Sequence, residues 1–306
     1  MENKRSFLLA VFSALGCLML TSGCETTGVL DNLGAIQVGN FRISESQMGA
    51  IKKTAKAVGK AFTDITPEQE YYVGRAVGAT LLGKYRPRTD PQTVQYLNLV
   101  GQSLASVSDM PETYGGYHFV LLEDDGINAF AAPGGLIFVS RGMLRCCQDE
   151  DTLAAVLAHE IAHVQLKHGL QAIKTSRLTS AFSIMATEGA KQAGGPQLAQ
   201  LTGIFEDSIH DVTATLVNSG YSRASEREAD GAALVILDRA GYDQRALVVL
   251  LGEMKKRLNP QGLDFAKTHP DPADRIAEIE PLLAQAKTPT GMALRQQRFK
   301  SALGSI

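Results

Sequence analysis

Residues 152–168 read TLAAVLAHEIAHVQLKH, and this stretch decides both the fold and the chemistry expected of the chain. Its apolar residues recur at helical spacing, so it predicts one helix that carries His-Glu-x-x-His at positions 159–163. Four residues turn an α-helix by about 400°, which places His159 and His163 on one face, a single turn apart. Two imidazoles in this arrangement are suited to hold one zinc ion.

The neighbours of these two histidines have separate expected roles. Glu160 lies beside the metal position, where it cannot easily bind the same ion but can take a proton from the zinc-bound water during attack on a carbonyl. His168 follows His159 by nine residues. If the helix continues that far, His168 is rotated by about 900° and faces the opposite side. The spacing therefore predicts that His168 is not a ligand.

A catalytic zinc site needs a third protein ligand from elsewhere in the chain. The best candidate lies in residues 221–230, YSRASEREAD, which begin an apolar-periodic helix ending near Gly241. Glu226 and Asp230 share a face of that helix, whereas Glu228 points elsewhere. Glu226 can bind zinc while Asp230 accepts a hydrogen bond from a ligand histidine and fixes its tautomer. The alternative is an acidic helix start favoured only by the helix dipole.

Further motifs extend the pattern over about residues 66–286. They are SRASEREAD at 222–230, NAFAAPGG at 128–135 and SRGML at 140–144. Together with HEIAH, they resemble the zinc peptidases that include the CAAX prenyl protease and the bacterial membrane heat-shock protease, the gluzincins of peptidase family M48. In that family the first glutamate of the downstream run is the third ligand, which corresponds to Glu226. The resemblance implies a zincin-like domain with one Zn²⁺ per subunit.

The same resemblance suggests roles for two further residues. In zincins the edge strand of the hairpin lies beside the cleft and can pair with an extended substrate through its backbone. Asn128 assists substrate binding there, or it is a turn-forming asparagine. Thr268-His269-Pro270 is similar to a Thr-His-Pro run of the family. His269 then stabilises the oxyanion, or acts as a fourth ligand that keeps the enzyme latent, or is a loop histidine beside a helix start.

The remaining pattern predicts a helix-dominated α+β domain with a small sheet. Thr66-Pro67 begins a helix to about Tyr85, and Asp90-Pro91 begins a second one. Short β-prone segments follow, and Pro133-Gly134-Gly135 joins the last two in a hairpin. The expected strands and later helices are at 117–122, 129–132, 136–140, 149–168, 172–189, 196–217, 222–240, 243–258 and 272–286.

The N-terminus has the pattern of an export signal. A basic start and an apolar run at 7–20 precede small residues and Cys24. The sequence LTSGC at 20–24 resembles the lipobox of bacterial lipoproteins, which implies cleavage before Cys24 and a lipid on that residue. Glu25 rather than Asp favours the outer membrane by the same resemblance. The alternative is ordinary cleavage that releases a soluble periplasmic protein.

Length and composition bound the domain organisation. The 306 residues, 44% of them hydrophobic, are sufficient for one main domain. We expect a signal peptide at 1–23, a lipidated N-terminus and tether at 24–65, the peptidase domain at 66–286 and a C-terminal tail at 287–306. The net charge of -2 gives no general attraction to nucleic acid.

Cys146 and Cys147 are adjacent in the sequence. Neighbouring cysteines rarely bridge each other, because a vicinal disulfide strains the intervening peptide. They are two buried thiols, or they form a bridge to a partner or a redox-sensitive pair.

The expected function is zinc-dependent hydrolysis of peptide bonds in unfolded or misassembled envelope proteins. No transmembrane helix is visible after Leu20, which argues against prenylated-peptide processing and favours a periplasmic lipoprotein branch of the family. That branch implies outer-membrane protein quality control, with the outer-membrane assembly machinery as a partner and the membrane reached through the lipid on Cys24. The alternatives are a periplasmic chaperone or assembly factor with latent or no proteolysis, and a zinc amidase that acts on cell-wall peptides.

Overall fold

The computed structural model describes six stretches of the chain, residues 36–38, 41–43, 65–173, 196–257, 269–286 and 289–304. The predicted signal peptide, Cys24, most of the predicted tether and nearly all of the helix expected at 172–189 lie outside these stretches. Two compact units divide the chain, Met1–Lys60 and Ala61–Ile306. In the first, β1 (Ile36–Val38) and β2 (Phe41–Ile43) pair antiparallel. Among the described residues, no helix combines the length and apolar character needed to cross a bilayer.

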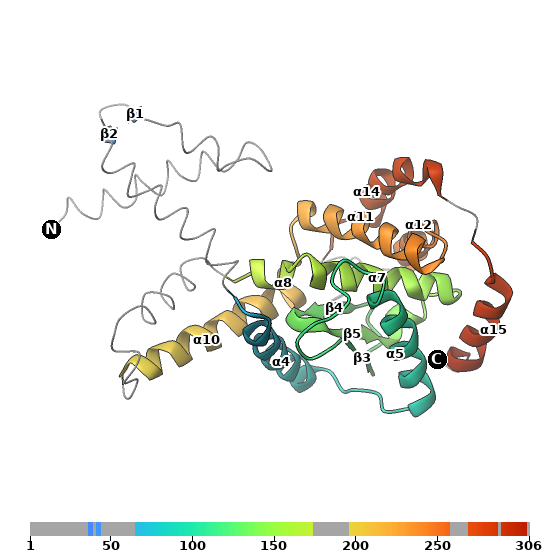
Figure 1. Ribbon diagram of the computed structural model, residues 1–306, viewed down its shortest axis with the longest axis horizontal. Helices are drawn as coiled ribbons and strands as arrows, with labels where there is room; N and C mark the ends of the chain where they lie inside the picture. The colour runs from blue at the N-terminus through green and yellow to red at the C-terminus, as the bar shows by residue number, and fades with distance from the viewer. Residues whose placement is uncertain are drawn as a thin grey trace. The chain divides into compact units, whose positions relative to one another are not determined.

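The second unit is helix-dominated and carries one small sheet, which confirms the predicted α+β class (Figure 1). Its elements are α4 (Pro67–Lys84), α5 (Pro91–Ala105), β3 (His118–Leu122), β4 (Ala129–Ala132), η1 (Pro133–Gly135), β5 (Leu136–Ser140), α6 (Arg141–Leu144), α7 (Glu150–Gln165), α8 (His168–Gln171), α10 (Pro196–Ala214), η3 (Thr215–Ser219), α11 (Arg223–Ala240), α12 (Ala246–Arg257), α14 (Pro272–Ile279), η4 (Glu280–Gln285) and α15 (Met292–Leu303).

The capping residues explain where the first helices begin. The hydroxyl of Thr66 accepts a hydrogen bond from the backbone N–H of Gln69, whose side chain accepts one from the N–H of Thr66 in return. Asp90 caps α5 through the N–H of Thr93. Each cap satisfies backbone donors that have no partner inside the helix. Both helix starts predicted from these sequences are therefore confirmed.

The sheet has the strand order β3-β5-β4, with β5 parallel to β3 and antiparallel to β4. The predicted hairpin between β4 and β5 is confirmed, and it turns through η1, where Gly134 has a φ of 75°. Helix α4 lies so close to this turn that a Cβ on Gly74 would be only 1.8 Å from the carbonyl oxygen of Pro133. In the described sheet β4 lies at one edge. The close contact with α4 fixes the turn that follows β4.

Helix α7 forms the centre of this unit. It lies between the three-stranded sheet and the layer of α11 and α12 (Figure 1). Every residue from Glu150 to Val164 is buried, and Leu153, Leu157 and Ile161 are among the largest fully buried side chains. A helix that is covered on all sides gives a rigid support for the side chains that it presents.

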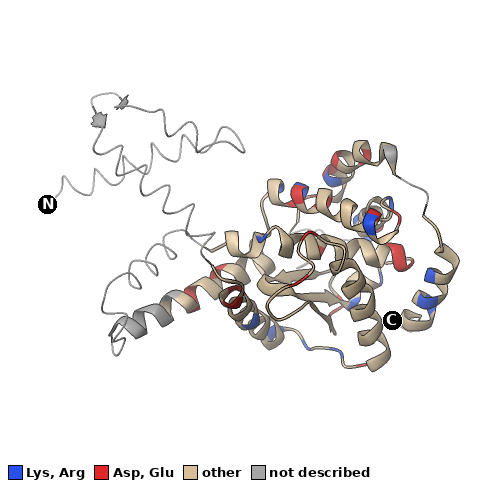
Figure 2. Cartoon of the chain, in the orientation of Figure 1, with Lys and Arg blue, Asp and Glu red and all other residues tan. Residues whose placement is uncertain are grey.

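The segment 287–306, expected to be a tail, contains helix α15, which packs against α7 and α5. Arg295 donates through Nε and Nη2 to Asp151 at 2.9 and 3.0 Å, and Arg298 donates to Glu150. These basic residues of α15 are blue in Figure 2. Because Glu150 and Asp151 are buried in the first turn of α7, the arginines neutralise charges that water cannot reach.

We expect Arg295→Ala to lower the free energy of unfolding by about 3 kcal/mol, since removing one partner leaves the other charge buried and unpaired. Urea denaturation followed by circular dichroism measures this loss. Lys300→Ala, at an exposed position of the same helix, is the matched control and should change stability by less than about 0.5 kcal/mol. Equal stability of the two variants would contradict the assigned role of the Arg295–Asp151 pair.

Candidate metal centre

His159 and His163 project from the same face of α7, as their spacing predicts. Their Nε2 atoms are 3.1 Å apart, and both side chains are buried. Two imidazole nitrogens this close need a shared proton or a shared cation between them. The centre of the buried helix therefore presents two nitrogen donors to one point.

Glu226 reaches the same point from α11. Ser222 begins this helix, because its hydroxyl accepts the N–H of Ser225. One turn later, Glu226 lies with Oε2 at 3.6 Å from Nε2 of His159 and with Oε1 at 3.5 Å from Nε2 of His163. Packing of α11 on α7 thus brings a carboxylate against the two histidines, which are more than sixty residues earlier in the sequence.

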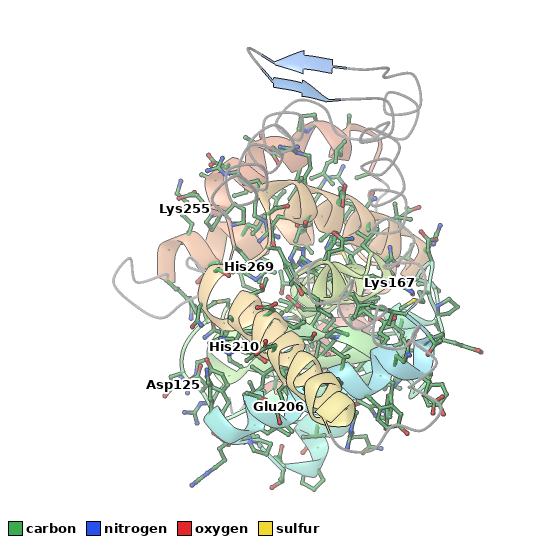
Figure 3. All side chains as sticks on the ribbon, turned by 90° about the vertical axis from the view of Figure 1, so that its left-hand side faces the viewer. Asp125, Lys167, Glu206, His210, Lys255 and His269 are labelled. Atoms are coloured by element: carbon green, nitrogen blue, oxygen red, sulfur yellow. The ribbon has the colours of Figure 1, made fainter. Side chains whose placement is uncertain are left out.

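His269, just before α14, completes the group (Figure 3). Its Nδ1 lies 2.8 Å from Oε2 of Glu226, and one donor atom from each of His159, His163, Glu226 and His269 lies within 4.8 Å of the others. His210, also labelled in Figure 3, is exposed on α10 and lies outside this group.

The four residues fit a zinc ion. No hydrogen-bond donor among the described residues satisfies the buried Oε1 of Glu226, although a buried carboxylate oxygen normally has a partner. Imidazole nitrogen and carboxylate oxygen are ligands that Zn²⁺ prefers. Despite the cost of burial, His269, His159 and His163 hold the pKa of the Glu226 carboxyl well below its usual range. The carboxylate is therefore ionised, as a metal ligand must be.

Asp230 and Arg275 support the group from behind. Oδ1 of Asp230 is 3.0 Å from Nδ1 of His159, and Arg275 donates to both carboxylate oxygens. Burial alone would raise the pKa of Asp230, but Arg275 and His159 lower it to about 2. The position of Asp230 agrees with the tautomer-fixing role expected of it. No role was predicted for Arg275, although it follows the Thr-His-Pro run closely in the sequence.

Glu160 lies beside the group and faces a small cavity. Its side chain is 2% exposed, and burial raises the pKa of its carboxyl to about 7, although nearby His159 lowers it. The cavity has a volume of about 10 Å³, which is room for about one water molecule. Around it lie Ala129, Phe130 and Ala131 of β4, Thr215 and Leu216 of η3, Gly220, Tyr221 and His269.

The cover over Glu160 comes from the end of α10. The helix expected to run regularly to 217 changes at Thr215 into a π-helical turn, η3, that ends at Gly220 with a φ of 70°. Tyr221 then stacks on the ring of His163, with centroids 4.4 Å apart. The cavity that Glu160 faces is therefore lined on one side by η3, Tyr221 and His269, and it is too small to admit a polypeptide chain.

The helix predicted to continue to His168 ends instead at Gln165, and this corrects the expected orientation of that histidine. Lys167 adopts a left-handed conformation with a φ of 56°, so the chain turns back towards α7. As a result, Nδ1 of His168 lies 2.9 Å from Nδ1 of His163, and Nε2 lies 3.3 Å from the carboxylate of Glu228. His168 is not one of the four converging donors, but it contacts one of them.

Asn128 immediately precedes β4 and is not itself among the residues that line the cavity. Its backbone N–H donates to Oγ of Ser140 at 3.0 Å, and its amide is 3.5 Å from Asp124. These contacts join Asn128 to the end of β5, and both roles predicted for it stay open. Cys146 and Cys147 are both buried, and no disulfide joins the two thiols.

Comparison with known proteins places this chain in a defined family. The family profile described as Peptidase family M48 matches residues 91–282. The chain is 29% identical over 218 residues to the beta-barrel assembly-enhancing protease of Escherichia coli (strain K12). The matched region covers 68% of this chain and 42% of that protein. It is 31% identical over 237 residues to the mitochondrial metalloendopeptidase OMA1 of Schizosaccharomyces pombe. Here the matched region covers 74% of this chain and 65% of the relative.

A further relative is the putative beta-barrel assembly-enhancing protease of Vibrio cholerae, 30% identical over 226 residues, 71% of this chain and 45% of that protein. The matched region thus spans 42 to 65% of the length of these three relatives. All three carry the name of a protease or a metalloendopeptidase.

Proposed function

Because this chain belongs to peptidase family M48, we propose that it is a zinc-dependent endopeptidase that hydrolyses peptide bonds of unfolded proteins. The observation that carries the proposal is the convergence of His159, His163 and Glu226 beside the buried carboxylate of Glu160. This arrangement offers three protein ligands to one ion and sets an acid–base group beside them, and that group lines the cavity.

We assign the three ligands to His159, His163 and Glu226, and the role of positioning His159 to Asp230. When bound, zinc polarises the scissile carbonyl and lowers the pKa of a coordinated water. Glu160 takes a proton from the attacking water and passes it to the leaving amine, a role that suits its place at the cavity. Burial raises the pKa of the Glu160 carboxyl to about 7, so near neutral pH this group can both accept a proton and release it.

The substrate chain binds along the edge of β4 that no other described strand pairs with, once the cover over this buried strand has moved. Ala129, Phe130 and Ala131 of this edge line the cavity next to Glu160. Backbone hydrogen bonds to an edge strand hold an extended peptide whatever its side chains are. This mode of binding favours unfolded segments, because a folded protein rarely offers a free extended strand.

We place the enzyme in the bacterial envelope, in outer-membrane protein quality control, held at the periplasmic face of the outer membrane by a lipid on Cys24. Support comes from the lipobox-like sequence at 20–24 and from relatives named beta-barrel assembly-enhancing proteases. The outer-membrane assembly machinery is the expected partner. The small cavity favours a second candidate, a chaperone with latent proteolysis.

Cleavage of an unfolded substrate tests the proposal. Purified residues 25–306 are incubated with casein and with an unfolded porin, before and after removal of metal with a chelator and after addition of zinc. Cleavage that disappears with the metal and returns with zinc supports the peptidase. Zinc binding without cleavage of either substrate would support the latent or chaperone role, and cleavage of cell-wall peptides alone would identify an amidase.

We assign His269 as the fourth donor that closes the site, because one of its ring nitrogens belongs to the ligand group and its side chain lines the cavity. His269→Ala is therefore expected to raise casein cleavage several-fold, since it frees one coordination position for water. Its zinc content should equal that of the wild type. The alternative, stabilisation of the oxyanion, predicts a loss of about 10²-fold instead, so the direction of the change decides between the two roles.

A further inference from the structure

We propose that His168 is a positioning residue for His163, and that the surface carboxylate of Glu228 orients His168 in turn. This inference rests on the proposed function only in taking His163 as a zinc ligand. It concerns residues that lie outside the four-donor group and that the proposed reaction does not use.

The contacts form one continuous line from the metal position to the protein surface. Nε2 of His163 faces the donors of His159 and Glu226, so its Nδ1 is left to bond elsewhere. That Nδ1 lies 2.9 Å from Nδ1 of His168, and Nε2 of His168 lies 3.3 Å from Oε2 of Glu228. The side chain of His168 is fully buried, whereas that of Glu228 is 62% exposed.

Only one placement of the protons on the two imidazole rings satisfies all of these hydrogen bonds. If Nε2 of His163 binds the metal, its Nδ1 carries the proton and donates it to the lone pair on Nδ1 of His168. His168 is then protonated at Nε2, which donates to the carboxylate of Glu228. A carboxylate at the far end therefore fixes the proton on each ring in the arrangement that metal binding requires.

The local backbone is built to bring His168 to this place. Lys167 is the only non-glycine residue with a positive φ in the described part of the chain. The left-handed conformation is unfavourable for such a residue. Here the ammonium of Lys167 lies 3.6 Å from buried Glu70, which also accepts the N–H of Gly134 in the hairpin turn. These contacts offset the strain and turn His168 back behind His163.

The two histidines of α7 consequently have different outer partners. His159 contacts Asp230, whose charge is already paired with Arg275 in the interior. His163 depends on a neutral histidine and on a carboxylate in contact with water. An exposed substitution at Glu228 can therefore alter the metal site without disturbing the packed core.

Zinc affinity, measured by competition with a chromogenic chelator, tests this inference without use of activity. Loss of an outer partner lowers metal affinity by about 10- to 100-fold, which is the expectation for His168→Leu. In His168→Asn the amide oxygen occupies the place of Nδ1 and accepts the proton of His163, so affinity should recover to within about threefold of the wild type. Glu228→Gln should lower affinity by about threefold to tenfold.

Two controls separate metal positioning from general stability. Glu206→Gln, an exposed substitution on α10, should leave zinc affinity unchanged (Figure 3). Urea denaturation in excess chelator should give the same midpoint for Glu228→Gln and the wild type. The absorption bands of bound cobalt(II) should shift only in variants that change His168 or Glu228.

The outcomes also distinguish this inference from the proposed function. If wild-type protein binds zinc while His168→Leu and Glu228→Gln bind it equally well, the positioning role is overturned and the peptidase assignment stands. If His168→Leu does not fold, unchanged affinity in Glu228→Gln overturns it. If the wild type binds no zinc, both proposals fail.

Discussion

Glu160→Gln is expected to keep its zinc and to lose about 10²- to 10⁴-fold in kcat/KM for casein cleavage. Glutamine has nearly the same shape as glutamate, but its amide cannot take a proton from the attacking water. Glu160 is not one of the converging donors, so metal content should equal that of the wild type. The measurement combines initial rates of peptide release with zinc determination by mass spectrometry.

The matched control is Glu123→Gln, a partly exposed carboxylate that pairs with Arg88 and Arg141 far from the cavity. It should keep full activity. A Glu160→Gln protein that cleaves casein at the wild-type rate would remove Glu160 from the mechanism. If instead the variant lost its metal, Glu160 would have to be counted among the ligands.

Glu226→Ala is expected to lose zinc, with an affinity reduced by more than the 10- to 100-fold that follows loss of an outer partner. The change removes a direct ligand and leaves the two histidines of α7 without the anion between them. It also removes a contact of Arg275, so some loss of stability should accompany the metal loss. Chelator competition and the zinc content after dialysis measure the effect.

Glu278→Ala serves as the comparison for Glu226→Ala. It removes an exposed carboxylate of α14 that pairs with Arg227, the residue next to Glu226 on α11. It should retain the wild-type zinc affinity. Asp230→Ala should fall between the two, in the range expected for an outer partner. If Glu226→Ala binds zinc as tightly as the wild type, the third ligand has been assigned wrongly and His269 becomes the first residue to test.

Local signals in the sequence were sufficient for most of the fold. The caps at Thr66, Asp90 and Ser222 and the hairpin at Pro133-Gly134-Gly135 are formed by residues close together in the chain, and all of them lie where they were predicted. Spacing on one helix also predicted that His159 and His163 share a face. The structure adds the convergence of these residues with Glu226 and His269.

Long-range and backbone effects account for what the sequence did not predict. The segment that forms helix α15 was expected to be a tail. Its packing depends on ion pairs with Glu150 and Asp151, which are far away in the chain and leave no local pattern in the sequence. The side of α7 that His168 faces depends on a single left-handed residue, Lys167. Helical periodicity assumes a regular backbone and cannot register such a change of direction.

Helix α15 has a consequence for the order of events during synthesis. Arg295 and Arg298 follow the carboxylates that they neutralise by 144 and 148 residues. At about 5–20 residues per second, a ribosome needs on the order of ten seconds to make that interval. Until then the first turn of α7 carries two acidic groups that resist burial. The two arginines that neutralise the start of the central helix are therefore among the last residues to be made, so a chain that stops before α15 leaves these buried carboxylates without their positive partners.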